Sequence, residues 1–178
     1  SEHRECLGVK TPWTTVQLIG SSVRTQLQKM RDRYDLIVVD CGGRDTTSQR
    51  AALTVADVLV APFQPRSLDI WTIGKLSALL EEVRAVNPRL KTYAVINRGD
   101  VSGRDNLESM EILQECEHIE CIPTAIFQRK AFANAAAEGL GVIELKVRDK
   151  KAVSEITALY EALFGSNKTS KANDKTTL

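Results

Sequence analysis

Residues Tyr34–Asp45 read YDLIVVDCGGRD, an apolar run that ends in an aspartate and is followed by two glycines. The run LIVVD at 36–40 predicts a buried parallel strand with Asp40 at its carboxyl end, where open parallel sheets bind their ligands. A carboxylate in that place is suited to hold Mg²⁺ through water, and Gly42 and Gly43 let the backbone approach a phosphate closely. An ordinary strand-end aspartate that caps the next helix fits the same spacing equally well.

A magnesium-holding aspartate of this kind works opposite a phosphate-binding loop of the pattern G-x-x-x-x-G-K-[ST]. The 178 residues contain a single Gly-Lys pair, Gly74-Lys75, which is followed by Leu76 and lies inside a predicted helix. Asp69, rather than a glycine, stands five residues before Gly74. Residues 1–178 therefore contain an aspartate typical of nucleotide-hydrolysing folds without the loop that would bind the phosphates.

Outward from this stretch, short apolar runs alternate with longer helical patterns. Strands are predicted at 14–19, 36–40, 57–63, 90–97 and, as a short one, within 120–126, and helices at 22–33, 47–55, 68–86, 105–115, 130–138 and 149–164. This alternation, with nearly continuous apolar strands, predicts an α/β fold with a mostly parallel, doubly wound sheet flanked by helices. We expect a single domain over 1–164 and a disordered polar tail over 165–178.

The composition favours a soluble, cytoplasmic protein. The net charge is +1, so a basic surface has to be local, and no apolar run reaches the roughly 18 residues of a membrane span. No signal-peptide pattern opens the sequence. The four cysteines match no zinc or redox spacing, and Cys116, His118 and Cys121 supply three soft ligands without a fourth. A phospho-receiver domain and an iron–sulfur site are disfavoured, because the further residues that each of them needs are missing.

Four segments resemble the ParA/MinD family of deviant-Walker ATPases, in particular the small ParA partition proteins of plasmids and mobile elements. They are YDLIVVDCGGRDT from Tyr34, AALTVADVLVAPFQPRSLDIW from Ala51, AVINR from Ala94 and TAIFQRKAFANAAAEGLGVIEL from Thr124. The resemblance runs from about 15 to 164. It implies a P-loop NTPase-like fold that uses ATP and Mg²⁺ and that forms a homodimer when ATP is bound.

The resemblance also implies roles for individual residues. Asp40 would be the Walker-B residue near Mg²⁺, which it holds through water, and Gly43 would lie in the second switch; we treat both as candidate catalytic residues. The adenine pocket would be formed by Asn97, Arg98, Pro123 and Thr124.

The sequence departs from the family at its beginning. The family opens with a strand, a K-G-G-x-G-K-[ST] loop, a helix and a second strand, a unit of roughly 30 or more residues that the resemblance places before Ser1. We therefore expect neither tight ATP binding nor hydrolysis nor the ATP-bound dimer from residues 1–178 alone. We also expect a sheet edge and a core face to be left bare.

The segment 128–151 is rich in basic residues, and the resemblance implies that it contacts DNA phosphates without reading the bases. Its basic side chains are Arg129, Lys130, Lys146, Arg148, Lys150 and Lys151. The helix dipole does not favour cations at the start of the last predicted helix, so their presence indicates a negatively charged partner. A merely solvated helix start is the alternative. The sequence contains no recognition helix and no base-reading motif.

Two functions remain in view. The first is the C-terminal part of a ParA-type partition ATPase. In its complete form such a protein binds ATP-Mg²⁺ and non-specific DNA on the nucleoid, responds to a ParB-like centromere-binding protein, and segregates plasmid or chromosomal DNA. The second is a paralogue without a P-loop that acts as a DNA- or protein-binding regulatory module without ATPase activity. A flavodoxin-like small-molecule binder is a weaker third. No membrane partner is expected, because the tail lacks the bulky apolar residues of a membrane-binding helix.

Overall fold

The computed structural model describes residues 4, 6–8, 11–42, 46–65, 70–102 and 104–165. Its centre is a parallel sheet of β1 (Val58–Phe63), β2 (Lys91–Gly99), β3 (Glu120–Cys121) and β4 (Ile126–Phe127). Strand β2 is the middle of this sheet. Its one edge pairs with β1, from Val58 opposite Lys91 to Phe63 opposite Ile96. Its other edge pairs first with β3 and then, beyond a shift in register, with β4.

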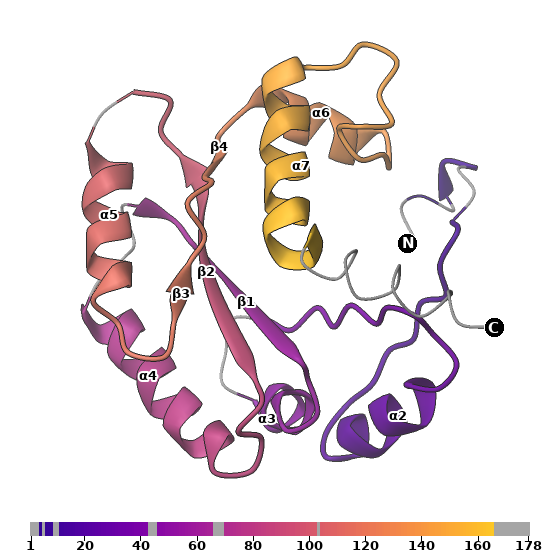
Figure 1. Cartoon of the computed structure of the whole chain (residues 1–178). Coiled ribbons are helices and arrows are strands. Elements are labelled where there is room, and N and C mark those ends of the chain that lie inside the picture. Colours follow the sequence, from indigo (N-terminus) through magenta and orange to yellow (C-terminus); the bar gives the residue numbers. More distant parts are fainter. Residues whose placement is uncertain are drawn as a thin grey trace, which may run out of the picture.

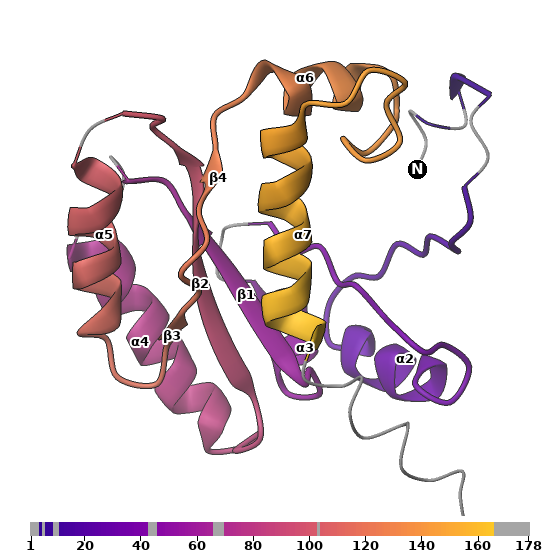
Figure 2. The same ribbon diagram turned by 45° about the horizontal axis from the view of Figure 1, so that its top comes forward.

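Helices cover both faces of the sheet, with α4 and α5 on one side and α7 on the other (Figures 1 and 2). The helices are α2 (Ser22–Met30), α3 (Thr47–Leu53), α4 (Ile70–Arg84), α5 (Asp105–Gln114), α6 (Lys130–Ala137) and α7 (Lys150–Phe164). Each begins and ends within three residues of its predicted bounds. The predicted parallel α/β fold is therefore confirmed, as are the strands predicted at 57–63 and 90–97.

The larger core lies between β1, β2 and the helices of one face. Alternate residues of a strand point to the same face, and Ala94 and Ile96 of β2 are both fully buried there. They join apolar side chains of α3, α4 and α5, namely Leu53, Leu79, Leu80, Val83 and Leu113. Asn87, just after α4, completes this layer, because its amide donates to the carbonyl oxygens of Leu53 and Ala56 at 2.9 and 2.8 Å.

A smaller core joins α6, α7 and the turn between them, around Ala135, Val142, Leu145 and Ala152. Arg4 packs against that turn, where its guanidinium donates to both carboxylate oxygens of Glu144 at 2.8 and 3.0 Å. Gly139 allows this approach. It has a φ of +67°, and a Cβ at this position would lie 3.2 Å from the Cα of Arg4.

Two predicted strands are wrong. Residues 14–19 and 36–40 form no strand, and β1 pairs with β2 alone among the strands of the described residues. Apolar side chains of both segments are exposed, including Leu36 at 58% and Val38 at 81%. The physical reason is that a strand needs a neighbour for its backbone hydrogen bonds, and the described part of the chain supplies none to either segment. An apolar pattern alone does not provide one.

The predicted disordered tail lies outside the described residues from residue 166 on. Within the described ranges, no three His, Cys, Asp or Glu side chains come together as a metal site. None of the helices that the structure describes has both the length and the apolar character needed to cross a membrane.

Candidate functional site

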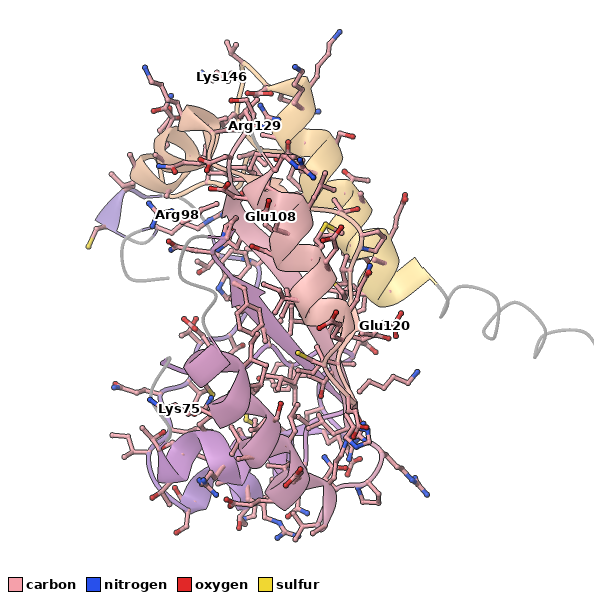
Figure 3. The ribbon with its side chains drawn as sticks, turned by 90° about the vertical axis from the view of Figure 1, so that its left-hand side faces the viewer. Lys75, Arg98, Glu108, Glu120, Arg129 and Lys146 are labelled. Carbon is pink, nitrogen blue, oxygen red and sulfur yellow. The ribbon has the colours of Figure 1, made fainter. Side chains whose placement is uncertain are left out.

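Several of the predicted site residues that the structure describes lie toward one end of the molecule. Because all strands run in parallel, β1, β2 and β4 end at the same edge, which we call the carboxyl edge. Arg98 at the end of β2, Arg129 before α6 and Lys146 before α7 lie toward this end, whereas Lys75 of α4 lies toward the other (Figure 3). Open parallel sheets bind ligands at this edge.

A cavity of about 450 Å³ opens at the carboxyl edge between α5, α7 and the loop before β4. Its lining includes the predicted pocket residues Pro123 and Thr124, together with Asp100, Asn106, Met110, Phe127 and Glu155. Asn97 and Arg98 do not line it. Asn97 is held in β2 opposite Ile126, and Arg98 is exposed with a φ of 57°. The structure therefore brings two of the four predicted pocket residues together.

A pair of hydrogen bonds fixes the backbone beside this cavity. The Asn106 side chain accepts from the amide of Asp100 at 3.1 Å and donates to the carbonyl oxygen of Asp100 at 2.7 Å. Gly99 permits this packing, since a Cβ there would lie 3.0 Å from the Asn106 Oδ1. Ser109 of α5 also donates to the carbonyl oxygen of Pro65, after β1, at 3.2 Å. The carboxyl ends of β1 and β2 are thus both tied to α5.

Glu155 of α7 is a site residue that the sequence analysis missed. It accepts from the amide of Phe127 at 3.2 Å and from the Nε of Arg129 at 2.7 Å. The Arg129 and Glu155 side chains are only 16% and 10% exposed, and the Arg129 guanidinium lies over the Phe127 ring, 5.4 Å from its centroid. The carboxylate of Glu155 raises the pKa of Arg129. A signal existed in the sequence, because Glu155 directly precedes Ile156 on the apolar stripe of the last helix.

The other basic residues of the predicted DNA surface are exposed. They are Lys130, Lys146, Arg148, Lys150 and Lys151. Asp149 accepts from the amides of Lys151 and Ala152 at 2.9 and 3.1 Å and so caps α7. This cap offsets the poor placement of cations at a helix start. The lysines therefore remain available to an outside partner, while Arg129 is engaged by Glu155.

Asp40 does not lie at the end of a strand. It belongs to the extended, exposed segment 36–42. The Cys41 thiol next to it has a raised pKa, first because of partial burial and second because of the Asp40 carboxylate. Gly43, the predicted switch residue, lies outside the described residues.

The residues present fit part of an ATP-Mg²⁺ site. Ligand pockets typically enclose about 300–1,000 Å³ and combine apolar walls with a few polar groups, and the cavity at Pro123 and Thr124 meets both conditions. The triphosphate is not matched, because the sequence contains no phosphate-binding loop and Asp40 does not end a strand. The cavity therefore has the volume of a small-ligand pocket.

Comparisons with known proteins point to the same group of ATPases. The family model described as ATPase MipZ matches residues 15–106. The chain is 26% identical over 141 residues to the maintenance of carboxysome distribution protein A of Halothiobacillus neapolitanus, covering 79% of this chain and 65% of that protein. It is 22% identical over 99 residues to a ParA family protein of Mycoplasma pneumoniae, covering 56% of this chain and 37% of that protein.

A solved structure supports the fold. The plasmid partition protein from Borrelia burgdorferi matches with a TM-score of 0.56 and 18% identity, over 86% of this chain and 56% of that one. The chain thus spans 65% or less of the length of each of these proteins. The resemblance to the ParA/MinD group is confirmed, and because the family model matches more than half of the residues, the chain belongs to the MipZ family of ATPases.

Proposed function

We propose that this chain supplies the base-binding and DNA-facing parts of a ParA-type partition ATPase. One observation carries the proposal: in a chain of this family, the cavity at Pro123 and Thr124 opens at the same end of the molecule as the basic residues before and at the start of α7. A nucleotide at the cavity and DNA at the basic surface would then act on the same end of the molecule. ParA-like relatives are consistent with this arrangement.

The proposal assigns the triphosphate to a P-loop on a segment outside residues 1–178. Two features support a place for such a segment: the edge of β1 that faces away from β2, and the exposed apolar side chains of Leu36 and Val38. A strand inserted between β1 and residues 36–40 would give each of them a neighbour for its backbone hydrogen bonds. Asp40 would then end a paired strand and could hold Mg²⁺ through water, with Gly43 following it.

The proposal assigns DNA binding to the exposed lysines and Arg148. Contacts with phosphates are independent of base sequence and weaken with salt, because they release condensed counterions. Arg129 contributes mainly by holding β4 to α7 through Glu155 and Phe127. The complete protein would bind DNA on the nucleoid as an ATP-bound homodimer, would be stimulated by a ParB-like partner, and would segregate plasmid or chromosomal DNA.

Nucleotide titrations test the first half of the proposal. A fluorescent ATP analogue with Mg²⁺ should show no saturation with residues 1–178, and should bind in the micromolar range once a P-loop-bearing segment from the same gene precedes them. In that longer chain, Asp40→Ala should weaken the Mg²⁺-dependent part of the affinity, whereas Asp35→Ala serves as a control in the same segment. Equal affinity of the two chains for ATP would contradict the proposal.

Salt titrations test the second half. Binding to a random duplex should weaken linearly in log salt, with a slope of about −0.9 for each phosphate neutralised. Replacing Lys146, Lys150 or Lys151 with Gln should each reduce the slope by about one unit on every duplex sequence. Lys29→Gln on α2 is the matched control. A binding curve without salt dependence would contradict the assignment of DNA binding to these basic residues.

The alternative is a regulatory module without ATPase activity. It is favoured by the finding that Asp40 does not end a strand in the described part of the chain. It predicts the same salt-dependent DNA binding but no gain of nucleotide affinity from any segment of the same gene. The ATP titration therefore separates the two functions, and the salt titration does not.

A further inference from the structure

A second opening lies at the other end of the sheet, where the strands begin. It has a volume of about 630 Å³ and is formed by the end of α4, the first residues of β2 and the turn before β3. We call it the amino-edge groove; its lining includes the polar residues Arg84, Arg89, Lys91, Thr92, Tyr93, His118 and Glu120. Lys91 and Asn97 are six residues apart along β2, which at about 3.3 Å per residue separates the groove from the carboxyl edge by roughly 20 Å.

The charges of the amino-edge groove are mostly positive. Arg84, Arg89 and Lys91 are cations, and the one carboxylate in the lining is that of Glu120. The whole chain is nearly neutral, at +1, so this is a local excess rather than a consequence of composition. Such a concave positive surface concentrates anions.

Two residues of the groove each carry a buried polar atom that has no hydrogen-bond partner in the described part of the chain. These atoms are the Oγ1 of Thr92 and the Nε of Arg84, and Thr92 as a whole is only 4% exposed. Buried polar groups in folded proteins are nearly always hydrogen-bonded, so an orphaned pair in one opening calls for a ligand or water. Both atoms can donate to an oxygen acceptor.

The contact between Arg84 and His118 orients the arginine fork. Its Nη1 lies 2.9 Å from the Nδ1 of His118. Because a guanidinium only donates, Nδ1 is the acceptor, which places the imidazole proton on Nε2. His118 itself has a φ of 68°, a backbone conformation that is uncommon outside glycine. With Nη1 taken by His118, the Nε edge of the fork is the edge that can serve a bound anion.

We propose that the amino-edge groove binds a phosphate-type oxyanion, with the Arg84 Nε and the Thr92 hydroxyl as donors and with Arg89 and Lys91 as flanking charges. A water molecule would satisfy the two buried donors but would leave the cationic excess uncompensated. A tetrahedral dianion satisfies both and accepts several hydrogen bonds at once. The site lies at the opposite end of the sheet from the proposed nucleotide and DNA surfaces and does not depend on either of them.

The test is a titration of the full chain at constant ionic strength, followed by the backbone amide resonances of Thr92, Tyr93 and His118. Three probes separate the sources of the anion: inorganic phosphate, AMP and adenosine. We expect saturable shifts with phosphate and with AMP, and none with adenosine. Further shifts with AMP alone would assign the site to a phosphomonoester of a larger ligand, and identical shifts would assign it to free phosphate.

Two variants test the donors. Thr92→Val keeps the shape and removes the hydroxyl, and Arg84→Gln removes the fork. Each should weaken phosphate affinity by about tenfold or more, since a hydrogen bond to a charged group is lost. Lys75→Gln, nine residues before Arg84 on the same helix and outside the lining of the groove, is the matched control and should leave the affinity unchanged. Linear shifts that never saturate, or an equal loss in Lys75→Gln, would overturn the proposal.

Folding is controlled independently. Thr92→Val exchanges an orphaned hydroxyl for a methyl group, so the variant should melt at the same temperature as the parent or higher in phosphate-free buffer. Phosphate should then raise the melting temperature of the parent and not that of Thr92→Val. An equal rise in both proteins would show that the anion does not use this groove.

Discussion

Two stretches of this chain have nearly the same apolar character and opposite fates. Residues Val58–Phe63 form strand β1, and their partner β2 runs alongside them from end to end. Residues 36–40 are at least as rich in Leu, Ile and Val, yet they form no strand and expose Leu36, Val38 and Val39. The difference lies in the neighbour. β-Propensity describes how well a side chain suits a pleated surface, and that surface exists only once another strand has paired.

Amide hydrogen exchange should show the largest contrast. Amides of Ala94–Ile96, in the strand that pairs on both edges, should exchange roughly a thousandfold or more slower than their intrinsic rates, because they open only with the fold. The amides of residues 36–39 should exchange at rates within a few-fold of their intrinsic exchange rates. Protection of 36–39 comparable to that of β2 would mean that this segment finds a strand neighbour in solution.

Truncation of apolar side chains should sharpen the contrast in free energy. Ile96 is fully buried, so Ile96→Ala should lower the free energy of unfolding by about 2–5 kcal/mol. Val38 is 81% exposed, so Val38→Ala should change it by less than about 0.5 kcal/mol. Urea denaturation measures both. When a P-loop-bearing segment is added, the Val38→Ala cost should rise, and an unchanged cost would show that Val38 stays exposed there.

The contact between the turn after α4 and the residues just before β1 should be the next most sensitive place, and we call this contact the joint. Asn87→Ala removes both hydrogen bonds to the carbonyl oxygens of Leu53 and Ala56. It should cost about 1–3 kcal/mol of unfolding free energy, because those partly buried oxygens lose their donor. Asn134→Ala, an exposed exchange of the same type on α6, is the control and should stay within about 0.5 kcal/mol. Similar urea midpoints for the two variants would contradict this account of the joint.

Acid should produce the smallest effect, at the contact that ties the N-terminal residues to the turn after α6. The pKa of Glu144 is lowered from 4.5 to about 2, first by the hydrogen bond from Arg4 and then by the amide of Gly141. A carboxylate with a depressed pKa stabilises the fold above its unfolded pKa, and this contribution is lost as pH falls through the folded value. The melting temperature should therefore fall between pH 4.5 and about 2, and Glu144→Gln should flatten that fall. Glu117→Gln is the control, and an equal flattening there would remove Glu144 as the cause.

Much of the fold was predictable because the local sequence pattern of a helix or a central strand indicates both the element and its buried face. The apolar stripe of α7 and the continuous apolar run of β2 each specify one element and its buried face. Whether 14–19 and 36–40 would pair was not predictable in this way. Pairing depends on which other strand is present to accept the hydrogen bonds, and no property of the segment itself encodes that.

The candidate site was predictable in its location and less so in its contacts. Pro123 and Thr124 line the cavity at the carboxyl edge, and their contact with a nucleotide base stays a prediction. Asn97 does not line it, because its place in β2 opposite Ile126 is a matter of register between distant segments. The engagement of Arg129 by Glu155 also spans 26 residues. Long-range polar pairs of this kind leave only a weak sign in the sequence, here a glutamate beside an apolar helical stripe.

The unpaired segment 36–42 is not a loose tether, because α2 before it is fastened to the body of the molecule at both ends. The amide of Gly20 donates to the Ser48 Oγ of α3 at 2.8 Å, and Arg31, just after α2, forms an ion pair with Asp57, just before β1. These two contacts already restrict the chain on either side of α2. A strand that pairs with residues 36–40 would therefore cost the chain less conformational entropy. The molecule is in this respect a ready acceptor for split-protein complementation. A separately expressed fragment that carries the missing strand would bind next to a segment that α2 and α3 already hold in place.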